Sequence, residues 1–110
     1  MGQCHDYFIV SIPKARFTNF IVEAPDKNKA IKKALSYINS NPDKFSGYLG
    51  KKKKIFTLKD IGGLIFTSKI RTEGRLDIDK EYDLEVNGLL VAGGKKIKDI
   101  ENHILLLESE

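Results

Sequence analysis

Few side chains in this sequence are of the types that carry out nucleophilic chemistry. Cys4 is the single cysteine, and His5 and His103 are the two histidines. A cysteine nucleophile needs a base within hydrogen-bond reach. In a strand His5 would point away from its neighbour Cys4, which leaves only His103. Because chain ends usually fray, we interpret Cys4 as an incidental thiol and predict that the protein is not an enzyme. An enzyme that uses His103 with carboxylates is the remaining catalytic alternative.

The same side chains argue against a bound metal. A structural zinc site needs three or four cysteine, histidine or carboxylate ligands at suitable spacing. One cysteine and two histidines nearly a hundred residues apart do not supply them. His103 lies beside the apolar run ILLL, which is typical of a half-buried packing histidine. We therefore expect no metal ligands and no cofactor.

Carboxylates recur at every second position in one segment, at Asp77, Asp79, Glu81, Asp83 and Glu85. Along a strand this spacing places all five on one face. A solvated outer face is the simplest interpretation. A divalent-metal patch, or a surface that pairs with the lysines of another copy, are the functional alternatives. The segment lacks the glycine and the terminal glutamate of an EF-hand loop, so we do not predict calcium binding.

A run of four lysines, Lys51, Lys52, Lys53 and Lys54, is the strongest candidate for a binding site. Lys29, Lys32 and Lys33 add positive charge on a predicted helix, and Tyr48 lies just upstream of the run, where it could stack on a base. If four to six of these lysines met phosphates, binding would be salt-sensitive and largely independent of sequence. Sixteen of the nineteen basic residues are lysine. Arginine is the residue suited to bidentate base recognition, so its scarcity counts against nucleic-acid recognition through the bases. A solvated charged face is the competing interpretation.

The charges are unevenly distributed along the chain. Residues 1–75 contain 15 Lys and Arg against 6 Asp and Glu, which gives +9, and residues 76–110 contain 4 against 9, which gives −5. A molecule built from both segments has a strong dipole that steers oppositely charged partners. The 110 residues suit one domain, so we predict a single domain over 1–110 with a basic part and an acidic part.

Composition limits the class of protein. The 41% hydrophobic and 31% charged content is that of a globular chain. No apolar run approaches the roughly 18 residues of a membrane span, and the first residues contain no apolar signal region. With a single cysteine no internal disulfide can form. We therefore expect a cytoplasmic, intracellular protein that does not bind a membrane.

The first forty residues predict two strands and a helix. DYFIVSI (6–12) and RFTNFIVEA (16–24) are strand-like, and the short link after Pro13 favours an antiparallel pair. Asp26 is the best N-cap of the following helix. Its apolar stripe, Ala30, Ile31, Ala34, Leu35 and Ile38, faces the sheet. Asn41 and Pro42 end the helix.

The remaining segments predict mostly strands. We expect a loop over 41–50, anchored by Phe45, Tyr48 and Leu49. Two strands should follow over 52–59 and 62–70, with a reversal of the chain at 60–63. A break over 71–76 then precedes a strand over 80–86. Asn87-Gly88 is a strong hairpin signal that leads into LLVAGG. A seam of isoleucines favours a helix from Lys96, although HILLLE also fits a closing strand.

The opening YFIVSI…NFIVEAPDKNKAIKKAL resembles the DpnD/PcfM-like small proteins of restriction and conjugation cassettes. Their pattern is also two strands, the second ending in an acidic-alanine step, followed by an A-I-x-K-A helix. The resemblance covers about the first forty residues and implies no site residue. It implies an accessory protein of a virus or a mobile element.

The sequence as a whole predicts an α+β domain. We expect a small antiparallel sheet of five or six strands, one amphipathic helix packed on it, and a C-terminal helix. The function that fits best is a non-enzymatic, basic binding module that contacts the backbone of DNA or RNA through a lysine-rich surface. The alternative is a protein–protein adaptor or inhibitor that binds an acidic protein surface and self-associates as a homo-oligomer.

Overall fold

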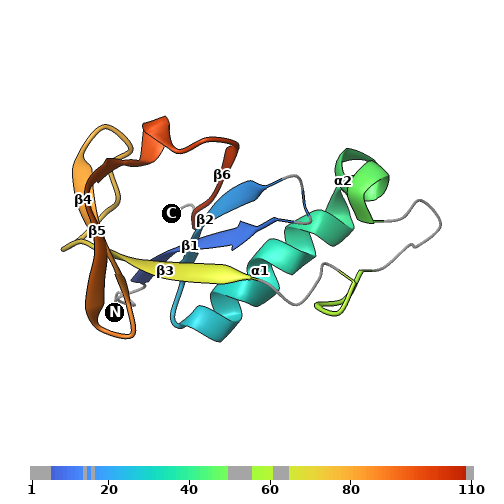
Figure 1. Cartoon of the computed structure of the whole chain (residues 1–110), viewed down its shortest axis with the longest axis horizontal. Helices are drawn as coiled ribbons and strands as arrows, with labels where there is room; N and C mark the ends of the chain where they lie inside the picture. The colour runs from blue at the N-terminus through green and yellow to red at the C-terminus, as the bar shows by residue number, and fades with distance from the viewer. Residues whose placement is uncertain (1–5, 14, 16, 50–55, 61–64, 109–110) are drawn as a thin grey trace.

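A single mixed sheet organises the protein. The computed structural model describes residues 6–13, 15, 17–49, 56–60 and 65–108, with only the backbone of 46–49. Six strands pair in the order β5-β4-β3-β1-β2-β6, and all neighbours are antiparallel except β2 and β6. Figure 1 shows the β4–β5 hairpin and α2 at opposite ends of the long axis. The basic and acidic parts of the chain each contribute strands to this one sheet.

The described part of the chain contains two α-helices, six strands and one 3-10 turn. Their bounds are β1 (Asp6–Ile12), β2 (Thr18–Ala24), α1 (Lys27–Ser40), α2 (Pro42–Leu49), β3 (Phe66–Arg71), β4 (Glu81–Val86), β5 (Leu89–Lys96), the 3-10 turn η1 (Ile97–Asp99) and β6 (His103–Leu106).

The predicted strand–strand–helix unit is confirmed. β1 and β2 pair antiparallel, with Val10 opposite Phe20. The Asp26 side chain accepts a hydrogen bond from the Lys29 amide at 2.8 Å and so caps α1. Ala30, Ala34 and Ile38 are buried against the sheet, as the apolar stripe predicts. The opposite face of α1 is therefore polar and directed away from the sheet.

The expected loop over 41–50 is wrong, because a second helix forms there. Pro42 ends α1, but it also begins α2, since proline is well suited to the first helical position, where no amide hydrogen bond is needed. Phe45 is buried, as predicted, and packs with Phe20 and Tyr37 at centroid distances of 6.3 and 6.4 Å. This aromatic contact holds α2 against the end of α1.

The strand predicted over 52–59 is not formed in its described part. Residues 52–55 lie outside the described residues. Phe56 is buried, its amide donates to Asn39 Oδ1 at 2.6 Å, and its carbonyl accepts from Asn39 Nδ2 at 3.0 Å. A turn closed by Asp60, which accepts from the Thr57 amide, follows. The side chain of Asn39 has therefore taken the place of a partner strand.

The next predicted strands are confirmed from residue 66 onward. β3 begins at Phe66, and most of the predicted reversal at 60–63 lies outside the described residues. Bends over 73–75 interrupt the chain after β3, as expected. Asn87 and Gly88 have φ of 51° and 82°, the left-handed pair that a two-residue type I′ hairpin requires. Shifts in register between β4 and β5 then curl this hairpin across the sheet.

The sheet buries apolar residues on both faces. One core cluster contains α1 and the second contains the curled hairpin and η1; its buried members are Tyr7, Ile9, Ile21, Ile70, Leu76, Tyr82 and Ile97. The hydroxyl of Tyr82 accepts a hydrogen bond from the Asp77 amide at 2.8 Å, which fixes the turn before β4.

The predicted C-terminal helix is wrong. Ile97 and Ile100 pack in the second core, whereas Ile104 packs against the first. A helix would place these isoleucines on one face, so the chain forms η1 and then β6 parallel to β2. Asn19 connects β2 to the turn before β6. Its backbone N–H donates to the Asn102 carbonyl, and its side-chain Nδ2 donates to the Glu101 carbonyl.

We expect Asn39→Ala to lower the free energy of unfolding by about 1–3 kcal/mol, because the buried Phe56 backbone loses both side-chain partners. Urea denaturation measures the change. Asn28→Ala, at an exposed position of the same helix, serves as the control. A loss for Asn39→Ala no larger than that of the control would contradict the role given to Asn39.

Candidate functional site

The outer face of α1 contains a group of exposed lysines. α1 contains four lysines and no carboxylate between Lys27 and Ser40. Lys27, Lys29 and Lys32 are exposed, and within the described parts of the chain no ion pair engages them. Lysines in the first turns also oppose the helix dipole. Their placement therefore adds little to stability and leaves their charge available to an anion.

Lys33 differs from the other lysines of α1 because its ammonium group contacts other elements of the fold. It is half-buried, and its ammonium group donates to the Glu23 carbonyl at 2.8 Å and lies 3.4 Å from a Glu108 carboxylate oxygen. The Glu108 amide in turn donates to the Glu23 side chain. Lys33 thus joins α1 to the end of β2 and to the segment after β6.

The structure describes little of the other predicted site residues. Lys51, Lys52, Lys53 and Lys54 fall outside the described residues. Tyr48 belongs to α2, and nothing is described of its side chain. The nearest described residue after the run is Phe56, bonded to Asn39 in the last turn of α1. Lys29 and Asn39 are ten positions apart, or about 15 Å along a helix. The structure thus brings Lys29 and Lys32 together on one face.

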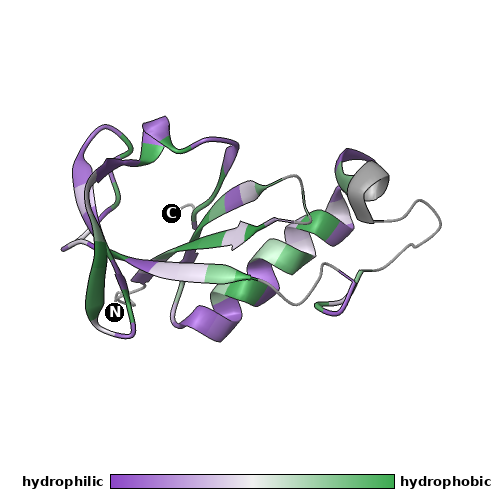
Figure 2. Ribbon diagram, viewed as in Figure 1, coloured by the Kyte–Doolittle hydropathy of each residue, from purple (hydrophilic) through white to green (hydrophobic). Residues whose placement is uncertain are grey.

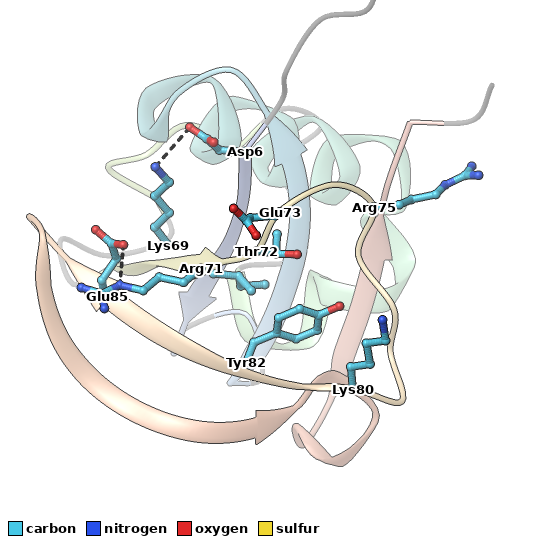
Figure 3. A pocket seen from close by; sticks show the side chains of 10 residues that line it. Asp6, Lys69, Arg71, Thr72, Glu73, Arg75, Lys80, Tyr82 and Glu85 are labelled. Carbon is cyan, nitrogen blue, oxygen red and sulfur yellow. Dashed lines mark hydrogen bonds and ion pairs between the residues drawn. The ribbon is translucent and has the colours of Figure 1, made fainter.

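A polar recess between β3, β4 and the chain joining them was not predicted from the sequence. Its volume is about 610 Å³, and basic and acidic side chains line it together (Figure 3). Lys69 lies 3.5 Å from Asp6, and Arg71 donates to Glu85 at 2.8 Å. In each of these pairs the opposite charges neutralise one another.

The predicted acidic face is only partly formed. Glu81, Asp83 and Glu85 lie in β4, but Asp77 and Asp79 belong to the preceding turn, where the Asp79 amide donates to Asp77 Oδ1. Asp83 accepts from the Gly94 amide and Asp79 pairs with Lys98. The expectation that all five carboxylates share one strand face is wrong. In the described residues no three histidine, cysteine or carboxylate side chains form a metal-binding group.

His103 is half-buried at the start of β6. Its Nδ1 lies 2.8 Å from the Ile100 carbonyl oxygen. Because a carbonyl only accepts, Nδ1 carries the proton, and in the neutral ring Nε2 is left as an acceptor. The adjoining cavity of about 360 Å³ is lined by Thr18, Lys44, Phe45, Asn102 and Ile104 together with His103. No described carboxylate lines this cavity, so the geometry offers the catalytic alternative little support.

Compared with known proteins, the chain matches no family model, and neither the curated proteins nor the solved structures contain a significant match. The resemblance to DpnD/PcfM-like proteins therefore depends on the opening residues alone. None of the described helices has the length and apolar character needed to cross a membrane.

The two kinds of lysine on α1 can be distinguished by stability. We expect Lys33→Met, which retains most of the aliphatic stem, to lower the free energy of unfolding by about 1 kcal/mol, because the Glu23 carbonyl loses its charged donor. Lys32→Met should stay within about 0.5 kcal/mol of the unaltered protein. Urea denaturation of both variants decides the matter, and equal losses would show that Lys33 has no special structural role.

Proposed function

We propose that this protein is a non-enzymatic binding module that contacts the phosphate backbone of DNA or RNA through lysines of α1 and the run Lys51–Lys54. The observation that supports the proposal is the outer face of α1, where exposed lysines form no ion pair with a described carboxylate and the helix itself contains no carboxylate. Figure 2 shows the hydrophilic start of this helix, at its opposite end from α2.

The physical basis is counterion release. A lysine that neutralises a phosphate displaces a condensed cation from the nucleic acid, so affinity falls steeply as salt rises. Lysine provides a point charge for this contact, whereas arginine also forms bidentate bonds to bases. The described part of α1 contains lysine but no arginine. The proposed contact is therefore to the backbone and independent of base sequence.

We expect Lys29→Ala combined with Lys32→Ala to weaken binding to a 20-base-pair duplex about tenfold at 50 mM NaCl. The slope of log affinity against log salt should also fall by about 1 for each lysine that contacts a phosphate. Fluorescence anisotropy with labelled duplex and single-stranded DNA and RNA, between 50 and 200 mM NaCl, gives both quantities.

The matched control is Lys80→Ala combined with Lys95→Ala. These lysines are also exposed, and the double change alters net charge equally. An equal loss of affinity in both double variants would show that the effect depends on net charge and not on the position of the lysines. No binding at 50 mM NaCl would rule out the proposal. The quadruple change Lys51–Lys54→Ala, measured beside them, gives the share of the lysine run.

A protein–protein adaptor or inhibitor is the second candidate, for example an accessory protein of a virus or mobile element. The exposed apolar end of the β4–β5 hairpin favours it, because nucleic-acid backbone offers no apolar surface to cover these side chains. In this case the lysines of α1 would meet an acidic protein surface. Tight binding to nucleic acid that withstands the α1 changes would count against both uses of this face.

A further inference from the structure

Large apolar side chains are exposed together at one end of the molecule. We name Val86, Leu89, Leu90 and Val91 the hairpin-end surface. Leu89 is 72% exposed, Leu90 57% and Val91 56%. Figure 2 shows the hydrophobic character of this part of β5. Single exposed apolar residues are common, but a contiguous group is typical of an interaction surface.

The backbone at this surface is open to pairing as well. β5 is the outermost strand of the sheet. In a two-residue hairpin Val86 and Leu89 exchange both backbone hydrogen bonds, so the N–H and C=O of Leu90 point to the open edge. Natural edges are usually protected by proline, charge or a β-bulge. Neither proline nor charge occurs between Leu89 and Gly94, and the register shifts of β5 begin only after Leu90. The other edge is better protected, because β6 is short and is followed by Glu108, which pairs with Lys33.

The β4–β5 hairpin lacks the net positive charge of the whole chain, which would cause two copies to repel each other. The whole chain has a net charge of +4, whereas residues 81–96 contain two lysines and three carboxylates, which gives −1. Two copies therefore meet with less repulsion at their hairpins than at their lysine-rich helices. The apolar part of β5, from Leu89 to Gly94, contains no lysine or arginine that could bind a phosphate. An apolar protein surface therefore fits this part of the strand better than a nucleic acid does.

We propose that the hairpin-end surface is a homodimer interface, in which β5 of one copy meets β5 of a second copy antiparallel about a two-fold axis. The same patch then serves both copies, and the contact closes on itself. Antiparallel packing brings Leu89, Leu90 and Val91 together and keeps Lys95 and Lys96 at opposite ends. A parallel contact would place these lysines side by side.

Side chains contribute more to this interface than strand pairing does. The β4–β5 register changes from Glu85 opposite Leu90 to Leu84 opposite Ala92, so Val91 is an extra residue on β5. Such a bulge twists the edge and limits continuous pairing to the few residues before it. The dimer is independent of the proposed nucleic-acid binding, because it does not use the outer face of α1.

Sedimentation equilibrium of the full chain tests the dimer. We expect a mass of twice 12.4 kDa at high protein concentration, retained in 0.5 M NaCl because apolar contacts are not screened by salt. Leu90→Lys places a charge in the centre of the interface and should yield a monomer. Phe17→Lys, at an apolar side chain that is 73% exposed elsewhere, should leave the dimer intact. Circular dichroism confirms that both variants are folded.

Disulfide trapping tests the orientation. In a Cys4→Ser background we expect Leu90→Cys to form a covalent dimer on oxidation, because residue 90 lies near the two-fold axis. Lys96→Cys should not do so, because the two copies of residue 96 lie far apart. A monomer at all concentrations, equal dissociation by Leu90→Lys and Phe17→Lys, or preferred cross-linking at residue 96 would overturn the proposal. Binding of the monomer to phosphatidylcholine vesicles through Leu90 would overturn it in favour of a membrane contact.

Discussion

Burial on both faces of the central strands is the constraint on which the rest of the structure depends. In β1 the consecutive residues Tyr7, Phe8, Ile9 and Val10 are all buried, although their side chains alternate between the two faces of the sheet. Each face therefore needs its own cover. α1 covers the face that contains Phe8 and Val10, and the β4–β5 hairpin curls with η1 over the face that contains Tyr7 and Ile9.

This two-sided burial also decides which surfaces remain available. Because α1 packs its alanines and isoleucines against the sheet, Lys27, Lys29 and Lys32 are exposed to solvent. The hairpin must curl to cover the second face, and its far end, from Val86 to Val91, extends beyond the core it closes. The exposed lysines of α1 and the hairpin-end surface thus follow from the same packing requirement, and we propose a different kind of partner for each.

Local elements could be predicted from the sequence where a short pattern of residues is compatible with a single local structure. Asp26 as a cap, the stripe from Ala30 to Ile38 and the Asn87-Gly88 turn each specify a short-range geometry, and each is confirmed. The α+β class is confirmed too, with a mostly antiparallel sheet of six strands. The parallel pairing of β6 with β2 is a long-range contact, and no local pattern encodes it.

The failures have physical causes that local patterns do not reveal. Spacings of three and four between Ile97, Ile100 and Ile104 fit a helix, but these residues serve two different cores. Polar Asn39 replaces a partner strand at Phe56. At the site, sequence grouped Lys29, Lys32 and Lys33 together, whereas the structure engages Lys33 with Glu23 and Glu108. The run Leu89-Leu90-Val91 read as an ordinary strand, because only tertiary structure shows that this strand lies at an edge.

Amide chemical-shift mapping can show whether the molecule has two independent binding surfaces. A ¹⁵N-labelled sample is titrated with duplex DNA at 50 mM NaCl and is separately diluted without DNA. We expect DNA to shift the amide resonances of Lys29 to Ser36, and dilution to shift those of Leu89 to Val91. A single set of amides responding to both, or DNA shifts centred on β5, would contradict this expectation.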